Sequence, residues 1–97
     1  MPTYVSLIHW TEHGIKNYKD TRKRLEDFTK LTESKGGRVR EALFTVGECD
    51  IVIVTEFSGD ETATAALLLV GSLGNVRTNT MRAFTADEMG GIVSRTD

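Results

Sequence analysis

The sequence predicts an α+β domain with the ferredoxin-like order βαββαβ: a four-stranded antiparallel sheet, two helices on one sheet face and a short C-terminal helix. Three observations predict this fold. Strand-like and helix-like hydrophobic spacings follow one another along the chain in that order. Residues 3–10 and 50–55 carry apolar side chains on both faces, as suits the two central strands of this topology. Residues 47–48 fit a tight hairpin loop between the second and third strands.

The first strand is predicted at residues 3–10, with Val5 and Leu7 on one face and Tyr4, Ser6 and Ile8 on the other. Residues 11–14 form a polar turn, and an irregular segment follows. We expect the first long helix to run from about Thr21 to Lys35, because Leu25, Phe28 and Leu31 recur at helical spacing. Gly36-Gly37 ends this helix, since one glycine can adopt the left-handed cap conformation.

The second strand is predicted at residues 39–46, and a two-residue loop, Gly47-Glu48, fixes its register with the third. The pairs expected on one face are Val46 with Cys49, Phe44 with Ile51, and Ala42 with Ile53; those on the other are Leu43 with Val52, Glu41 with Val54, and Val39 with Glu56. The first face is wholly apolar and is expected to carry the helices. The second has carboxylates at one end and suits an interface or a cavity.

Capping boxes mark the remaining helices. The box at residues 58–61 predicts a helix that packs on the sheet through Ala63, Ala66, Leu67 and Val70, and Gly74 ends it. The last strand is expected at residues 75–84, with Val76, Thr78, Thr80, Arg82 and Phe84 on one face. The box at residues 85–88 begins a short terminal helix, which Gly90-Gly91 weakens. The apolar side chains of Met89, Ile92 and Val93 are expected to dock this helix on the domain.

Composition excludes several classes of protein. The 97 residues suffice for one domain, and the net charge of -2 with a pI near 5.7 argues against a nucleic-acid partner. The longest apolar run, residues 65–70, is too short for a membrane span, so no membrane partner is expected. Cys49 is the single cysteine, and the start of the chain shows no leader pattern, so we expect a cytoplasmic protein.

Three segments of the chain also resemble a known family, the GYD domain family of small bacterial proteins. They are Trp10-Thr11 followed by Gly14-Ile15-Lys16-Asn17, the turn Gly47-Glu48-Cys49-Asp50, and Ser72-Leu73-Gly74-Asn75-Val76-Arg77-Thr78 running on to Arg82-Ala83-Phe84-Thr85. Gly47 and Asp50 match the glycine and aspartate that name the family, and Cys49 stands where the tyrosine would be. The resemblance covers nearly the whole chain and implies a ferredoxin-like fold with a dimeric α/β-barrel type of assembly, without an established activity.

The leading hypothesis for function is a homo-oligomer, at least a dimer, that binds a small organic ligand between packed sheets. Helices cover one sheet face, so a second copy is expected to hide the hydrocarbon of Ile8, Val52 and Val54 on the other. The candidate ligand-binding residues expected on that open face are Ser6, Trp10, Glu41, Glu56, Thr78 and Arg82. A purely structural assembly domain is an alternative, and no cofactor is expected.

The first alternative to ligand binding is a cofactor-independent oxygenase or isomerase of the dimeric α/β-barrel type, with Glu56 or His9 as the base. Glu41 and Glu56 share a face, so one carboxyl pKa could be raised, although a polar rim with ion pairs to arginine is the preferred interpretation. His9 and His13 fit no metal motif, so no metal site is expected.

Basic residues crowd the start of the first long helix, where the helix dipole favours negative charge. They are Lys19, Arg22, Lys23 and Arg24. One interpretation is a phosphate or carboxylate ligand held by helix amides and arginine. The preferred interpretation is a solvent-exposed face balanced by the nearby acids Asp20, Glu26 and Asp27.

Overall fold

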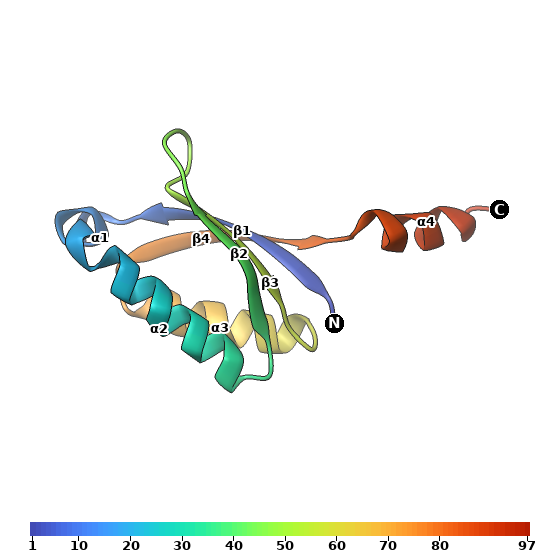
Figure 1. Ribbon diagram of the computed structural model, residues 1–97, viewed down its shortest axis with the longest axis horizontal. Coiled ribbons are helices and arrows are strands. Elements are labelled where there is room, and N and C mark those ends of the chain that lie inside the picture. Colours follow the sequence, from blue (N-terminus) through green and yellow to red (C-terminus); the bar gives the residue numbers. More distant parts are fainter.

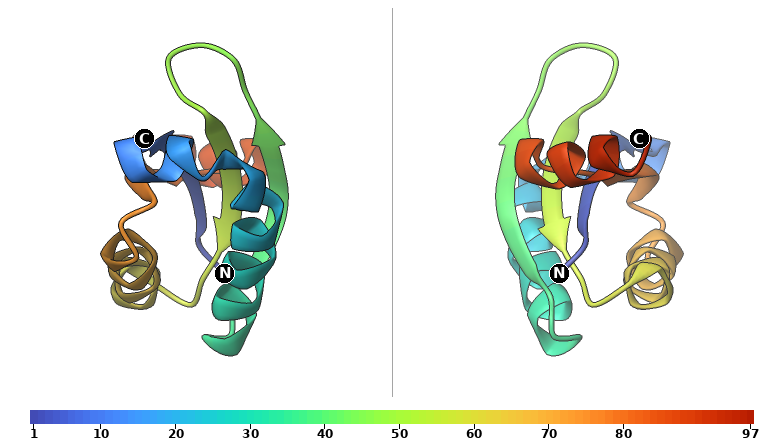
Figure 2. Two further views of the ribbon diagram at one scale, coloured as in Figure 1. Left: turned by 90° about the vertical axis from the view of Figure 1, so that its left-hand side faces the viewer. Right: turned by 90° about the vertical axis from the view of Figure 1, so that its right-hand side faces the viewer.

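The computed structural model describes all residues, 1–97, and has the predicted α+β architecture (Figure 1). The elements are β1 (Thr3–Trp10), α1 (Glu12–Lys16), the 3-10 turn η1 (Tyr18–Asp20), α2 (Thr21–Ser34), β2 (Arg38–Phe44), β3 (Ile51–Glu56), α3 (Asp60–Ser72), β4 (Val76–Ala83) and α4 (Ala86–Ser94). The four strands form one antiparallel sheet in the order β2-β3-β1-β4. Both α2 and α3 lie on the same face of that sheet (Figure 2). The ferredoxin-like prediction is therefore confirmed.

The core lies between the sheet and these two helices, in two adjoining clusters. Under α3, Tyr4 and Phe57 pack with Ala63 and Ala66, whose small side chains allow the helix to approach the sheet closely. Under α2, the buried cluster consists of Ile8, Phe28, Ile51 and Ile53. Ile8 is therefore covered by the chain's own helices, and the expectation that a neighbouring copy covers it is wrong.

The register of the hairpin is partly as predicted. Phe44 pairs with Ile51, Leu43 with Val52, Ala42 with Ile53 and Glu41 with Val54, as expected. A β-bulge between Val39 and Glu41 then shifts the ladder, so that Val39 pairs with Thr55 and Arg38 pairs with Glu56. Strand pairing also ends at Phe44 and Ile51, so the connecting loop spans residues 45–50 and is longer than the predicted two-residue loop.

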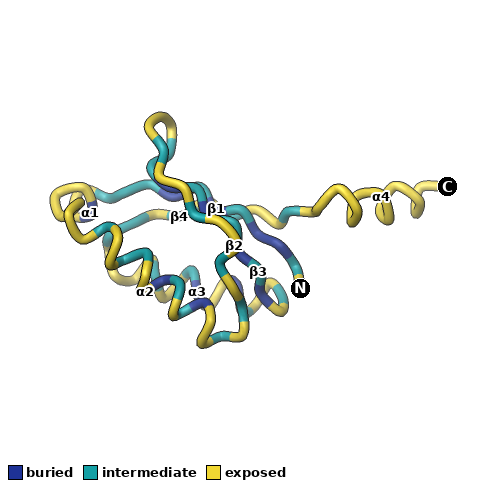
Figure 3. The backbone as a smooth tube through the Cα atoms, viewed as in Figure 1, coloured by how far each residue is buried: buried dark blue, intermediate teal, exposed yellow.

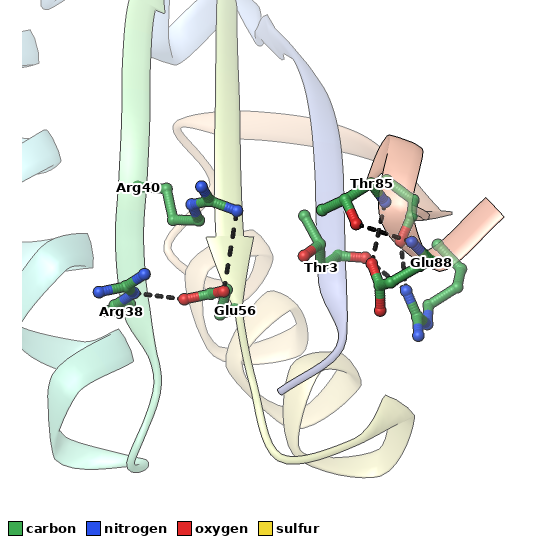
Figure 4. Close-up of polar contacts among 8 residues, drawn as sticks. Thr3, Arg38, Arg40, Glu56, Thr85 and Glu88 are labelled. Carbon is green, nitrogen blue, oxygen red and sulfur yellow. Dashed lines mark hydrogen bonds and ion pairs between the residues drawn. The ribbon is translucent and has the colours of Figure 1, made fainter. Parts of the chain in front are cut away.

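The helices differ from the prediction at two places. The polar turn after β1 is the short helix α1, capped by the Thr11 hydroxyl, which accepts a hydrogen bond from the Gly14 amide at 3.0 Å. The first long helix begins at Thr21, as predicted, and Asp20 is its N-cap. The capping box predicted at residues 58–61 does not form, because Gly59 is the N-cap of α3 and no side chain caps it. The box at residues 85–88 does form, at the start of α4 (Figure 4).

The terminal helix α4 projects away from the rest of the chain, and every one of its residues is exposed (Figure 3). Met89, Ile92 and Val93 therefore dock on nothing within the subunit, contrary to the prediction. No helix in the structure has both the length and the apolar character needed to cross a membrane.

The sheet face opposite α2 and α3, called the open face below, is apolar at its centre. Its inner side chains are Val5 and Leu7 of β1, Val52 and Val54 of β3, Leu43 of β2 and Met81 of β4. Leu43 is 53% exposed and Met81 is 44% exposed. The two-faced apolar character of β1 and β3 thus leaves one hydrophobic surface without cover inside the subunit.

Candidate functional site

A cavity of about 240 Å³ lies between α2, α3 and the helix-covered face of the sheet. Eleven of its sixteen lining residues are hydrophobic. The lining consists of Ile8, Trp10, Thr21, Arg24, Leu25, Asp27, Phe28, Leu31, Ile51, Ile53, Leu67, Val70, Leu73, Asn75, Val76 and Thr78. The cavity exists because α2 packs mainly on β2 and α3 mainly on β4, so the two helices contact each other little over the central strands.

Periodicity explains which side chains reach the cavity. On α2, Thr21, Arg24 and Phe28 recur at intervals of three and four residues and therefore share one helix face. On β1, Ile8 and Trp10 are two residues apart and therefore point to the same side of the sheet. The cavity is thus built from regular elements, which hold their side chains more rigidly than loops do.

The polar groups gather at one end of the cavity. Trp10 is the last residue of β1, Thr21 is the first residue of α2, and Asn75 directly precedes β4. Three polar atoms of cavity-lining side chains are shielded from solvent and have no hydrogen-bond partner in the chain: Trp10 Nε1, Thr21 Oγ1 and Arg24 Nη1. Buried indole and guanidinium N–H groups are normally paired, so these atoms mark a functional candidate.

Arg24 is oriented by the segment between β1 and α2. Its Nη2 atom donates hydrogen bonds of 3.1 Å to the carbonyl oxygens of both Gly14 and Asn17. No carboxylate lies within ion-pair distance of this guanidinium, whereas the neighbouring Lys23 pairs with Asp27 at 2.6 Å. Arg24 therefore brings an uncompensated positive charge, in a fixed orientation, to a largely apolar cavity.

The wall beside Trp10 is held together by contacts between α1 and the start of β4. The Thr11 amide donates to the Asn75 carbonyl at 3.1 Å, and the Thr11 hydroxyl donates to the Gly74 carbonyl at 2.6 Å. Gly14 lies so close to this strand that an added Cβ atom would be 1.9 Å from the Asn75 oxygen. Only glycine allows α1 to approach β4 in this way.

The hairpin loop supports Trp10 from its other side. The Trp10 amide donates a 2.9 Å hydrogen bond to Asp50 Oδ2, and the Asp50 amide donates to the Ile8 carbonyl at 2.8 Å. The three segments that carried the family resemblance therefore meet around Trp10 in space. Cys49 is a free thiol of intermediate exposure in this loop.

The structure divides the predicted ligand-binding residues between the two sheet faces. Trp10 and Thr78 line the cavity. Ser6 and Arg82 lie on the same helix-covered face but outside the cavity, and the Ser6 hydroxyl hydrogen-bonds to that of Thr80 at 2.7 Å. The guanidinium of Arg82 stacks 4.4 Å from the Phe84 ring centroid and 5.8 Å from that of Tyr4. The expectation that Ser6, Trp10, Thr78 and Arg82 share the open face is therefore wrong.

The remaining candidates, Glu41 and Glu56, do lie on the open face, as predicted. Glu56 is paired with two arginines of β2: its carboxylate contacts Arg38 directly and lies 3.8 Å from Arg40 (Figure 4). These ion pairs match the preferred interpretation of a polar rim, with Arg38 and Arg40 in place of the expected Arg82.

His9, the other candidate base, lies opposite Arg77 on the open face. Its Nε2 atom is 2.6 Å from the Glu48 carbonyl oxygen. Both proposed bases, His9 and Glu56, are thus engaged by neighbouring groups and lie on the sheet face opposite the cavity.

A separate buried polar contact joins β1 to α3. The Tyr4 hydroxyl donates a short hydrogen bond to Asp60 Oδ1, and the Tyr4 side chain is buried in the core. Burial, the hydrogen bond and the negative charge of Asp60 together raise the pKa of Tyr4 from 10.0 to about 12, against a smaller lowering by Arg82. This contact fixes the N-terminus of α3 to the sheet, and it is a structural link outside the cavity.

Sequence reasoning did not name Thr21 as a site residue, and it connected Arg24 with an anionic ligand only in the interpretation that was not preferred. The available signal was the excess of basic residues at the start of α2, for which the solvent-exposed interpretation was preferred. The structure separates the members of that group. Lys23 forms the expected ion pair with Asp27, whereas Arg24 turns toward the cavity and pairs with no acid.

Comparison with known proteins gives one match. The sequence model of the GYD domain family matches residues 4–93, which is nearly the whole chain. Neither a curated protein nor a solved structure matches the chain with significant similarity.

Proposed function

The chain belongs to the GYD domain family, and we propose that it is a cytoplasmic, homo-oligomeric domain that binds a small organic molecule in a cavity of each subunit. The observation that carries this proposal is the cavity between α2, α3 and the sheet, with its hydrophobic wall and few polar groups at one end. Small-molecule sites in proteins have this composition. The proposed binding site therefore lies inside the subunit, and we favour it over a site between packed sheets.

The size of the cavity limits the ligand. An engineered cavity of about 150 Å³ holds benzene. By that scale, a volume of about 240 Å³ suits a molecule of roughly ten non-hydrogen atoms. A single aromatic or alicyclic ring with one or two substituents has this size.

Binding can be measured directly, because Trp10 is the only tryptophan in the chain and it lines the cavity. Titration with toluene, a compact apolar probe, is expected to change the Trp10 emission and to raise the melting temperature with concentration. Val70→Phe fills part of the cavity and is expected to abolish both effects. Leu68 lies on the same helix and is 70% exposed, so Leu68→Phe is the matched control and should leave both effects unchanged.

The proposal fails if toluene produces neither effect in the wild type, or if Val70→Phe responds as the wild type does. A specific site loses its ligand when its volume is filled, whereas non-specific binding to exposed apolar residues does not depend on Val70. Circular dichroism and the unliganded melting temperature test whether the Val70→Phe chain is folded, and a loss of binding in a folded variant is assigned to the cavity.

Association is the second part of the proposal, and the open face supports it. Leu43 and Met81 expose apolar area at the edges of this face, beside the central Val52 and Val54. Contiguous exposed apolar surface of this kind marks an interaction site in proteins. Light scattering is expected to give at least a dimer, and a monomer throughout the micromolar range would remove this part of the proposal.

A further inference from the structure

We propose that the cavity selects monoanionic ligands, in particular small aromatic or alicyclic carboxylates, and that Arg24 holds the carboxylate. This inference rests on the proposed function, since it names the chemical class of the molecule that occupies the same cavity. It is carried by Arg24, the only basic residue of the lining, together with Trp10 and Thr21, which line the same cavity. Each of the three has a polar atom that is shielded from solvent and makes no hydrogen bond in the chain.

Arg24 is prepared to bind an anion. One of its terminal nitrogens is already anchored to the carbonyl oxygens of Gly14 and Asn17, so the guanidinium loses little further freedom on binding. The other terminal nitrogen is buried and lacks an acceptor. A guanidinium in a largely apolar lining without a counterion is less favourable than a paired one, and a carboxylate oxygen supplies both the charge and the acceptor that it lacks.

The two neighbouring groups favour the same kind of ligand. The indole N–H of Trp10 can only donate a hydrogen bond, so its partner must be an acceptor. The hydroxyl of Thr21 can donate as well, and Thr21 is the first residue of α2, where the helix dipole is positive. No side chain caps this helix end. All three groups therefore favour a hydrogen-bond acceptor that carries negative charge.

The charge of the lining indicates a monoanion. Arg24 is the only basic residue that lines the cavity, and Asp27 is the only acidic one. Asp27 is neutralised by its 2.6 Å ion pair with Lys23, which leaves a single positive charge. A carboxylate matches that charge and the planar fork of the guanidinium, whereas a phosphate dianion would retain a buried negative charge.

The rest of the cavity suits an apolar body. Along α2, Arg24 precedes Leu31 by seven residues, which is roughly 10 Å of helix. The side chains beyond the polar end include Phe28, Leu31 and Ile53, and they offer no hydrogen-bonding group. The cavity is thus amphipathic, and a ligand with one anionic end and one hydrocarbon end fits it in a single direction.

The experiment compares benzoate with benzamide, which has the same shape without the charge, in titrations followed by Trp10 fluorescence and calorimetry. Because charge-assisted hydrogen bonds to a buried arginine are strong, the wild type is expected to bind benzoate at least about tenfold more tightly than benzamide. Toluene, which lacks any acceptor, tests the cavity without the polar end.

Variants then assign the preference to Arg24. Arg24→Met keeps the length of the side chain and removes its charge, so it should lose the preference for benzoate and still bind toluene. Arg22→Met removes a charge from the same helix outside the cavity, and it is the matched control that keeps the preference. Arg24 also donates to the carbonyl groups of Gly14 and Asn17, so its replacement could disturb the local structure. Thr21→Val is therefore a second variant, because the hydroxyl that it removes makes no hydrogen bond in the chain. It should weaken the preference for benzoate and leave toluene binding unchanged.

The outcomes separate this inference from the proposed function. Equal affinity for benzoate and benzamide in the wild type, or an unchanged preference in Arg24→Met, overturns the inference and leaves toluene binding intact. If the three polar atoms bind only water, neither Thr21→Val nor Arg24→Met changes the preference between benzoate and benzamide, and this result also overturns the inference. Binding of none of the three probes overturns both proposals.

Discussion

The backbone amide of Trp10 donates a 2.9 Å hydrogen bond to the carboxylate of Asp50. Trp10 ends β1 and lines the cavity, while Asp50 ends the loop between β2 and β3. The last ladder pair between β1 and β3 is Ile8 with Ile51. The Asp50 side chain extends the contact between these strands to Trp10, two residues further along β1. The aspartate of the GYD turn thus holds the residue on which the proposed binding site depends.

Replacing that aspartate tests its structural role. Asp50→Ala removes the acceptor of a partly buried amide, and we expect it to lower the free energy of unfolding by about 1–3 kcal/mol. The Trp10 emission should shift toward that of a solvent-exposed indole. Asp50→Asn retains a side-chain oxygen acceptor and is the matched control, with a smaller loss. Equal stability of Asp50→Ala and the wild type in urea would contradict this role.

Two glycine substitutions are expected to have opposite effects. Gly14→Ala places a methyl group against the Asn75 carbonyl, pushes α1 away from β4, and should cost about 1–3 kcal/mol of stability. Gly71 lies in α3, and an added Cβ there would meet nothing within 4 Å. Gly71→Ala should therefore stabilise the chain by about 0.5–1 kcal/mol, because alanine loses less backbone entropy in a helix. Chemical denaturation of both variants measures this difference, and effects of the same sign would be evidence against it.

The contact between Tyr4 and Asp60 gives a pH dependence. The pKa of Tyr4 rises from 10.0 to about 12 on folding, so the folded chain holds this proton more tightly than the unfolded chain. The resulting stability is fully present below pH 10 and is lost as the pH rises toward 12. We expect the advantage of the wild type over Tyr4→Phe to fall by about 1 kcal/mol per pH unit in the middle of this window. A difference that stays constant from pH 8 to 11.5 would show that the hydroxyl has no raised pKa.

The projecting helix α4 gives a prediction about association. Its apolar residues Met89, Ile92 and Val93 are exposed, and a neighbouring copy is the proposed partner. Ile92→Asp should therefore weaken association measured by light scattering and leave the far-ultraviolet circular dichroism of the subunit unchanged, because α4 does not pack on its own subunit. Leu68→Asp, on an exposed position of α3, is the control and should not affect association. If Ile92→Asp associates as the wild type does, α4 is not part of the interface.

The sequence predicted most of the sheet because its signals are local. Four of the hairpin pairs follow from alternation and from the position of Gly47. The bulge between Val39 and Glu41 could not be predicted, since no glycine or proline marks it and an extra residue is placed by the hydrogen bonds of the whole ladder. The prediction of a capping box at Ser58 was wrong for a related reason. Ser58 and Glu61 are suitable residues for the box, but the path of the backbone through Gly59 decides whether it forms.

The sequence by itself determined the four strands and the helices α2, α3 and α4, and that Ser6, Trp10, Thr78 and Arg82 occupy alternating positions of β1 and β4. Only the tertiary structure decided that these positions face the helices, and that Trp10, Thr21 and Arg24 meet at one end of a cavity. The physical reason is that residue spacing fixes the direction of a side chain within its own element. Which elements then pack together, and how much space two separated helices leave above a sheet, depends on contacts between residues far apart in the chain.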